Sequence, residues 1–449
     1  MTEISLPVVD SAPRMTQDRK TTVGNYFVAN YPPFGFWKPD QVPAFDRALA
    51  TPPRADTRMG VYAHIPFCRK RCHFCYFRVY TDKNAGQIRR YLDAMLAEHE
   101  HYAKQPVIDG RTPKFVYFGG GTPSYLSPDQ FGHLADGMQR HLPWDDAEEI
   151  TLEGEPGTLN AKKLRAIRDI GVTRLSLGIE HFDDDILELN GRAHRSKEVH
   201  RAYEAARAAD FPEINVDLIA GMLDETDEKW DDTIEKTIDL GPDTVTIYQM
   251  EVPYNTTIYK WMKEEGRTVA PIVDWEVKRA WVAHAFRRFE EAGYTVTSAT
   301  TVVKDPARNR FVYRNGLFDG SDVVSVGVSA FGHVNGVNYQ NEHDFDPYID
   351  AVHERTRPTY RAYALSDEER YIRELALQLK SGRVETAPFT AKFGRSPQEQ
   401  FREAFTVLVA DGFLRVEDDA VAFTPAGLMQ ADRLLFELFR PEHRHGRFA

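Results

Sequence analysis

The three cysteines of this 449-residue chain, Cys68, Cys72 and Cys75, all lie in one short stretch. Thiolates this close together can ligate one soft metal centre, and closely spaced cysteine thiolates hold iron–sulfur clusters. If three thiolates hold a cluster of four irons, one iron has no protein ligand. The spacing therefore predicts a four-iron cluster whose open iron can take an outside ligand.

Zinc binding, a disulfide framework and a buried core are the alternatives to a cluster. A structural zinc site needs four ligands, and His64 or His73 could supply the fourth. A disulfide framework is typical of small secreted chains with an even number of cysteines, and this chain is neither small nor even in its count. Buried core cysteines would be scattered along the chain instead of gathered in one window.

Alternating strands and helices must position this stretch. The apolar runs that we interpret as buried strands are 59–65, 114–118, 149–153, 173–179, 214–219 and 243–249, and the helical patterns include 86–104, 128–141, 160–169, 196–209 and 227–239. Near-continuous apolar strands separated by helices indicate parallel pairing through crossover helices. We therefore expect an α/β fold, a full or partial TIM-type β/α barrel, with its chemistry at the carboxyl ends of the strands.

Polar motifs follow successive strands of this predicted barrel. A glycine triplet, 119–121, follows the second strand; it would let the backbone approach a ligand, and its exposed N–H groups could receive an anion. Glu153 ends the third strand, Glu180 follows the fourth and Asp217 belongs to the fifth. A glycine triplet alone is weak evidence, but the motifs together predict a site at one end of the barrel.

Taken in order, these motifs resemble those of the radical S-adenosylmethionine (radical SAM) superfamily. The C-x3-C-x2-C loop with Phe74, the GGGTP motif and Tyr62 in Tyr-x-His-Ile-Pro-Phe-Cys are similar to one branch, oxygen-independent coproporphyrinogen III oxidase and its relatives. The resemblance covers about residues 58–440. It implies that the three cysteines hold a 4Fe–4S cluster, that the open iron chelates SAM, and that one or two SAM molecules bind.

The resemblance also implies a set of cofactor-binding residues. They are Tyr62, Phe74, Gly119, Gly120, Thr122, Glu153, Glu180, Arg192, Asp217 and Ala330. Arg192 is expected to face the SAM carboxylate, or else to form a surface ion pair with residues 183–185. Glu180 stands where the family usually has glutamine, and it either faces the adenosine of SAM or pairs with Arg192 or Arg174. The segment 326–330 is either part of a second SAM site or a plain buried strand with a turn.

The activity implied by the resemblance is SAM cleavage to a 5′-deoxyadenosyl radical, followed by hydrogen abstraction from a substrate such as a tetrapyrrole propionate. The branch also contains methyltransferases and cyclopropane-forming enzymes that use two SAM molecules, and heme chaperones. The chaperones carry a His-Asn pair, whereas residues 311–315 here contain no histidine, which favours an enzyme. A flavodoxin or ferredoxin is the expected reductant, and no catalytic residue is assigned.

We expect four regions. They are an N-terminal arm (1–58) without a clear periodic element, a barrel core (59–260), a barrel extension (261–360) and a C-terminal winged-helix-like domain (361–449). The aromatic, proline-interrupted stretch 25–37 cannot be a regular helix, and it either packs on the main domain or covers the site as a lid. Helices followed by a hairpin near 412–424 indicate the winged helix.

Net charge, hydrophobicity and cysteine content limit the kinds of partner and the cellular location that we expect. The net charge of −12 and the acidic side chains around the winged helix argue against nucleic-acid binding. There is no run of 18 apolar residues, so no membrane span is expected, and residues 1–23 lack the apolar core of a secretion signal. Free cysteines suit a reducing compartment, so we expect a cytoplasmic protein with a small-molecule substrate.

Overall fold

A computed structural model of the chain describes residues 27–55, 57–264, 272–355 and 357–444. Residues 1–23, which lack the apolar core of a secretion signal, lie outside the described residues. Residues 25 and 26 of the aromatic stretch do too. None of the described helices is long and apolar enough to cross a membrane.

One sheet of twelve strands organises the molecule, in the order β12-β11-β10-β9-β1-β2-β3-β4-β5-β6-β8-β7. Its strands are β1 (Met59–Ile65), β2 (Phe115–Gly120), β3 (Glu149–Gly154), β4 (Arg174–Glu180), β5 (Glu213–Ala220), β6 (Thr244–Gln249), β7 (Thr295–Ser298), β8 (Thr301–Val303), β9 (Asp322–Val326), β10 (Phe331–Val334), β11 (Val337–Asn341) and β12 (Thr359–Ala364). Strands β1 to β6 pair in parallel, which confirms the parallel pairing predicted for the apolar runs.

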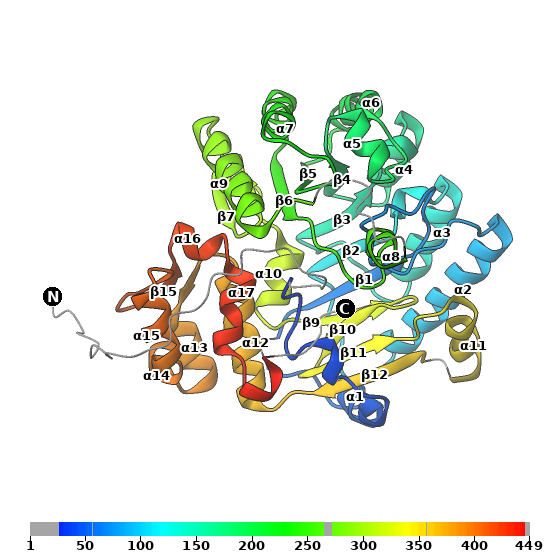
Figure 1. The fold of residues 1–449 in the computed structure, drawn as a ribbon. Helices are drawn as coiled ribbons and strands as arrows, with labels where there is room; N and C mark the ends of the chain where they lie inside the picture. Colours follow the sequence, from blue (N-terminus) through cyan, green and yellow to red (C-terminus); the bar gives the residue numbers. More distant parts are fainter. Residues whose placement is uncertain (1–26, 56, 265–271, 356, 445–449) are drawn as a thin grey trace.

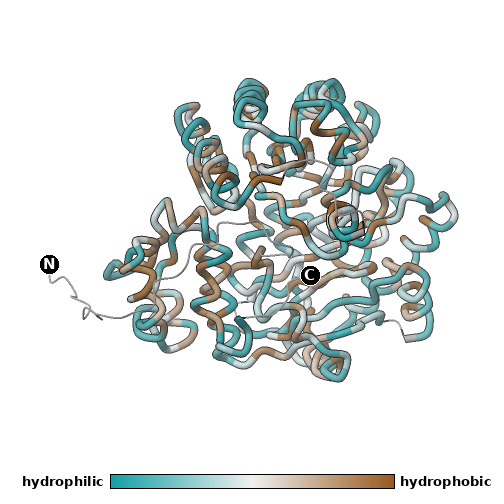
Figure 2. Tube along the Cα trace, in the orientation of Figure 1, coloured by the Kyte–Doolittle hydropathy of each residue, from teal (hydrophilic) through white to brown (hydrophobic). Residues whose placement is uncertain are grey.

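Helices connect these strands, and most of them lie around the outside of the curved sheet (Figure 1). They are α2 (Ala85–Ala103), α3 (Pro128–Gln139), α4 (Ala161–Asp169), α5 (Asp184–Leu189), α6 (Ser196–Ala208), α7 (Asp227–Leu240), α8 (Thr257–Glu264), α9 (Trp275–Glu291), α10 (Val312–Phe318) and α11 (Phe345–Arg355). Helix α2 begins with a capping box between Asn84 and Gln87, and α7 ends at Gly241 in the left-handed conformation. Apolar residues concentrate along the inner strands and polar residues on the outer helices (Figure 2).

The chain after β6 extends the same sheet at both edges. The hairpin β7–β8 pairs antiparallel with β6, whereas β9 returns to the opposite edge and pairs in parallel with β1. Strands β10 to β12 then continue that edge in antiparallel fashion. The sheet is therefore a partial β/α barrel with an added antiparallel wall, as the fold prediction expects.

The C-terminal part contains helices and a small antiparallel sheet, as the winged-helix pattern predicts. Its elements are α12 (Asp367–Leu379), β13 (Arg383–Glu385), α13 (Thr386–Phe393), α14 (Pro397–Gln400), α15 (Arg402–Ala410), β14 (Leu414–Val416), β15 (Ala420–Phe423), α16 (Pro425–Leu428) and α17 (Ala431–Leu434). The order of the sheet, β13-β15-β14, adds β13 to the predicted hairpin.

The arm preceding the barrel packs against this C-terminal part. Val28 and Tyr31 are buried in the same apolar cluster as α12 and α15, and the Val28 N–H donates to Asp432 (2.8 Å). The expectation of no periodic element before residue 59 is wrong, because α1 (Val42–Leu49) forms a short helix that buries Phe45. No regular α-helix forms in the described part of the aromatic stretch, which has only the 3₁₀ turn η1 (Phe34–Phe36).

Candidate active site

The carboxyl ends of the parallel strands open into a cavity of about 1310 Å³. All three cysteines line it, together with side chains from strands β1 to β6, the arm and the C-terminal part. Of the ten residues implied as cofactor-binding, eight line this cavity. They are Tyr62, Phe74, Gly120, Thr122, Glu153, Glu180, Arg192 and Asp217.

The cysteines lie on the loop that follows β1, which backbone hydrogen bonds hold on both sides. The Cys68 N–H donates to Tyr80 O (3.0 Å) and the His73 N–H donates to Asn190 O (3.0 Å). Two protein donors reach the sulfurs: Thr122 Oγ1 lies 3.3 Å from Cys68 Sγ, and Arg192 NH1 lies 3.2 Å from Cys72 Sγ. Hydrogen bonds to ligand sulfurs are one of the means by which proteins tune iron–sulfur clusters.

Burial makes two of these thiols poor acids in the absence of a metal. It raises the pKa of Cys68 to about 11 and that of Cys75 to about 12. Coordination to a metal deprotonates a thiol outright, so a cluster would stabilise the thiolate form that burial disfavours. Three thiols on one loop, facing one cavity and reached by an arginine and a hydroxyl, are a donor set that fits a cluster.

A single zinc ion fits this loop less well. A structural zinc site needs four protein ligands, so the three thiolates would need one of the two nearby histidines as well. His64 instead lies 3.0 Å from Tyr62 OH through Nδ1, and His73 Nδ1 lies 2.9 Å from Leu189 O. The two histidines considered as a fourth zinc ligand are thus engaged elsewhere.

The glycine triplet serves packing instead of anion binding. The N–H of Gly120 donates to Glu153 Oε2 (3.0 Å) and that of Gly121 donates to Ile65 O (2.8 Å), so the expectation of exposed N–H groups is wrong at these two positions. A Cβ on Gly120 would lie 2.5 Å from the ring of His64, and one on Gly121 would lie 2.8 Å from Ile65 O. Glycine is required here because the cysteine loop and β1 pass directly against the end of β2.

Three carboxylates from neighbouring strands share the cavity. Glu153 accepts hydrogen bonds from Tyr117 OH (2.7 Å) and Gly120 N–H, and Asp217 accepts from Ser176 Oγ (2.9 Å). Burial raises the pKa of Glu153 and of Glu180 to about 7 and also raises the pKa of Asp217, and mutual repulsion adds to the shifts of Glu153 and Glu180. A cationic or hydroxyl-rich ligand would relieve this cost, because it would compensate buried negative charge.

Arg192 provides the positive charge beside these carboxylates. Its NH1 lies 3.4 Å from Glu180 Oε1, and its NH2 donates to Gly178 O. The alternative of a surface ion pair with residues 183–185 is wrong, because the Arg192 side chain is directed into the cavity. Glu180 adopts a left-handed conformation (φ 64°) at the end of β4, where the register with β5 shifts. The pairing of Glu180 with Arg192, one of its two predicted roles, is observed here.

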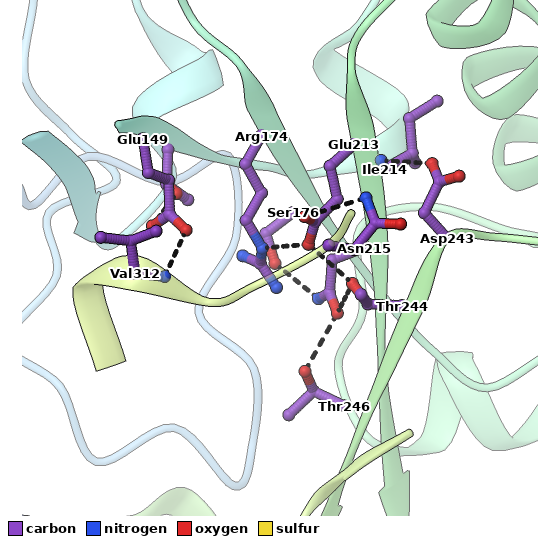
Figure 3. Close-up of polar contacts among 12 residues, drawn as sticks. Glu149, Arg174, Ser176, Glu213, Ile214, Asn215, Asp243, Thr244, Thr246 and Val312 are labelled. Carbon is purple, nitrogen blue, oxygen red and sulfur yellow. Dashed lines mark hydrogen bonds and ion pairs between the residues drawn. The ribbon is translucent and has the colours of Figure 1, made fainter. Parts of the chain in front are cut away.

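A buried polar layer beneath the cavity holds this arrangement (Figure 3). Asn215 donates to both Ser176 Oγ (2.8 Å) and Asp217 Oδ1 (2.9 Å), and Arg174 Nε donates to Glu213 Oε1 (2.8 Å). Arg174 is therefore the partner of Glu213 and not of Glu180. Because Ser176 and Asn215 both donate to Asp217, the orientation of this carboxylate is fixed from below.

Sequence reasoning missed an aromatic wall of the cavity. Tyr117 stacks on Tyr313 with ring centroids 4.2 Å apart, and on Tyr62 at 5.9 Å. Tyr117 is paired with Tyr62 in the β1–β2 register, so the alternation along predicted strands could have found it. Tyr313, from α10, had no such signal. Two implied residues, Gly119 and Ala330, do not line the cavity; Ala330 is fully buried after β9.

Comparison with known proteins agrees with this geometry. The model of the family described as "Radical SAM superfamily" matches residues 62–237. The parallel barrel, the cysteine loop and this match define a radical SAM protein. The chain is 30% identical over 377 residues to the heme chaperone HemW of Bacillus subtilis, covering 82% of this chain and 96% of that protein. It is 24% identical over 425 residues to the oxygen-independent coproporphyrinogen III oxidase of Pseudomonas aeruginosa, covering 90% of each.

The chain thus belongs to the radical SAM family that contains HemW and oxygen-independent coproporphyrinogen III oxidase. A 4Fe–4S cluster and SAM are the cofactors of this superfamily, in agreement with the cysteine spacing. The solved structure of coproporphyrinogen III oxidase (HemN) from Escherichia coli has the same fold: the TM-score is 0.79 at 23% identity, covering 92% of this chain and 96% of that one.

Proposed function

We propose that this chain is a radical SAM enzyme that abstracts hydrogen from a carboxylate-bearing tetrapyrrole. The observation that carries the proposal is that three cluster-type thiols, three carboxylates and Arg192 face one cavity of about 1310 Å³. Drug-sized ligands occupy pockets of about 300–1000 Å³. The cavity therefore has room for SAM and a large organic substrate together.

The residues around the cavity can bind the groups that SAM and such a substrate would present. When bound, the cluster and SAM supply a 5′-deoxyadenosyl radical. Arg192 can pair with a carboxylate, and Glu153, Glu180 and Asp217 can accept hydrogen bonds from hydroxyl and ammonium groups. The stacked rings of Tyr62, Tyr117 and Tyr313 form a flat apolar wall that excludes water from this part of the site.

Several relatives are named oxygen-independent coproporphyrinogen III oxidase. The reaction that we propose is therefore the one that the sequence resemblance implies, oxidative decarboxylation of propionate side chains. A methyl-transferring or cyclopropane-forming reaction with two SAM molecules remains the alternative enzyme function. The second SAM stays a prediction, since Ala330 is buried while Ser329 beside it lines the cavity. We also propose a flavodoxin or ferredoxin as electron donor and a reducing, cytoplasmic setting for the thiols.

A heme chaperone is the second candidate, and the identity to HemW favours it specifically. Against it, residues 311–315 lack the histidine expected for chaperones, and in the structure this segment begins α10 and contributes Tyr313 to the cavity wall. A chaperone would bind and release heme without consuming SAM.

One anaerobic experiment separates these functions. Reconstituted protein is incubated with SAM, dithionite and either coproporphyrinogen III or heme, and the products are read by mass spectrometry. Loss of formic-acid mass with 5′-deoxyadenosine formation supports the oxidase, and gain of a methylene group supports the alkyl-transfer alternative. Stoichiometric heme binding with neither product would overturn the enzyme proposal in favour of a chaperone.

A further inference from the structure

Two arginines, Arg361 and Arg373, line the cavity away from the cysteine loop. Arg373 (α12) is only 2% exposed and Arg361 (β12) is half-buried, and both face the cavity. Among the described residues, neither forms an ion pair with an acidic side chain. Glu374, adjacent to Arg373 in sequence, is instead engaged by Lys392 at 2.7 Å. Burying an uncompensated charge is costly, so an anion in the cavity would stabilise both groups.

Neutral acceptors, two of them from the arm, hold both guanidiniums in place. Arg373 donates through Nε to Asn30 Oδ1 (2.8 Å) and through NH1 to Leu317 O (3.2 Å). Arg361 donates through Nε to Gln340 Oε1 (2.7 Å) and through NH1 to Phe34 O (2.9 Å). In the described part of the chain, no protein acceptor is hydrogen-bonded to NH2 of either arginine. Each guanidinium is thus held on one side, and its NH2 has no acceptor among the described residues.

At Arg373, burial outweighs the attraction of nearby Glu374. It lowers the pKa of Arg373 to about 10 and lowers the pKa of Arg361. Nearby His333, which lines the same wall, has its pKa held well below the usual value by burial and then by the charges of Arg373 and Arg54. Such a field favours a negatively charged ligand.

An aromatic surface lies beside Arg361. Register places Arg361, Gln340 and Phe331 side by side across β12, β11 and β10, and Phe34 of the arm stacks on Phe331 with ring centroids 4.4 Å apart. His333 lies two residues beyond Phe331 on the same face of the strand, and its imidazole is close enough to Arg373 to feel its charge. The wall therefore offers apolar rings beside two fixed cations.

We propose that Arg361 and Arg373 bind carboxylate groups of the organic substrate, whose flat apolar part lies on Phe34 and Phe331. This assignment rests on the proposed function and deepens it by naming where the substrate's anionic groups bind. The planar guanidinium fork matches a carboxylate, and the aromatic surface matches an amphipathic ligand better than a free inorganic anion.

The test uses reconstituted holoprotein with enough SAM to saturate its cluster-bound site. Binding of 1-pyrenebutyrate is compared by fluorescence with binding of 1-pyrenebutanol, which has the same ring system but no charge. The wild type should bind the acid at least about tenfold more tightly than the alcohol. Arg361→Gln and Arg373→Gln should each weaken acid binding roughly tenfold, the loss expected for a charge-assisted contact, and leave alcohol binding unchanged.

Matched variants keep the result interpretable. Arg78 also lines the cavity but is paired with Asp344, so Arg78→Gln should leave the acid preference unchanged. If Arg373→Gln fails to fold, Arg361→Gln and the charge-preserving Arg373→Lys still carry the test. Equal binding of acid and alcohol by the wild type, or an acid preference that survives in the arginine variants, would overturn the proposal.

Three further outcomes separate the possibilities. The first distinguishes a substrate carboxylate site from a second SAM site, and the other two distinguish failure of this carboxylate site from failure of the proposed substrate. Displacement of 1-pyrenebutyrate by excess SAM would assign these arginines to a second SAM molecule and contradict the proposal. Arginine-dependent acid binding without any reaction on coproporphyrinogen III would retain the carboxylate site and reject the proposed substrate. Turnover of coproporphyrinogen III that is unaffected by both arginine variants would retain the proposed substrate and reject the carboxylate site.

Discussion

Arg192 and Glu180 form an ion pair inside the cavity, with NH1 3.4 Å from Oε1. The same nitrogen lies 3.2 Å from Cys72 Sγ, so one guanidinium connects the cysteine loop to the end of β4. A carboxylate at position 180 therefore acts on the charge balance of the whole cofactor site.

Replacing Glu180 by glutamine keeps the shape of the side chain and removes its charge. We expect SAM affinity to weaken by roughly 1–2 kcal/mol, about the difference between a charged and a neutral hydrogen bond. Equilibrium dialysis on the reconstituted protein measures this, and iron content should not change. Unchanged affinity together with a lower Tm would show that Glu180 serves only as the structural partner of Arg192.

Each cysteine should be indispensable for the cluster. Reconstituted wild type should hold about four irons per chain, and alanine at Cys68, Cys72 or Cys75 should abolish reductive SAM cleavage. Iron analysis and detection of 5′-deoxyadenosine provide the two readouts. Stoichiometric zinc without iron, after anaerobic purification, would contradict the cluster assignment.

Two glycines offer a matched comparison. A Cβ on Gly121 would lie 2.8 Å from Ile65 O and 2.9 Å from Pro66 C, whereas one on Gly132 in α3 would have nothing within 4 Å. Gly121→Ala should therefore displace the cysteine loop, cost about 1–3 kcal/mol of unfolding free energy and reduce iron incorporation. Gly132→Ala should raise stability by up to about 1 kcal/mol. Chemical denaturation tests both, and equal behaviour would refute the packing argument.

Glu98 should make stability depend on pH. It is fully buried in α2 and accepts hydrogen bonds from Gly327 N–H (2.9 Å) and Tyr348 OH (2.6 Å), while burial raises its pKa from 4.5 to about 7. Between these values the native state holds the proton more tightly than the unfolded state. The stability contributed by the protonated group is thus complete below pH 4.5 and is lost as the pH rises through 7.

The Glu98→Gln variant isolates this contribution. Relative to the variant, wild type should lose roughly 3 kcal/mol between pH 4.5 and pH 8. Urea denaturation of both proteins across this range gives the difference directly. A stability difference that is independent of pH would mean that Glu98 titrates alike in the folded and unfolded states.

The parallel core could be predicted because its strands are buried on both faces and therefore appear as continuous apolar runs. The return of β9 to the edge of β1 could not, since pairing between Met59 and Asp322 leaves no local pattern in either segment. Helix α1 could not be predicted either, because it is short and its apolar side chains follow prolines. The three-residue strand β13 is too short to show alternation.

For the site too, residues with a local sequence signal could be predicted, and residues placed by tertiary packing could not. The cysteines and the carboxylates at strand ends are local signals, and eight of the ten implied residues line the cavity. Arg361, Arg373 and Tyr313 carry no local signal, because their place in the cavity depends on how the extension, the arm and α12 meet. The glycine triplet lies at the predicted strand end, but the N–H groups of Gly120 and Gly121 are engaged by Glu153 and Ile65 and are not exposed as predicted.

The contact between Val28 and Asp432 joins residues 404 positions apart, and Lys380 Nζ donates to both, to Val28 O (3.0 Å) and to Asp432 Oδ1 (2.7 Å). At bacterial or eukaryotic elongation rates, roughly 20–80 s separate the synthesis of these two residues. We therefore expect the last anchor of the arm, the contact of Val28 with Asp432, to form only after the barrel and its cysteine loop have been made. Iron would reach the nascent loop most freely in that interval.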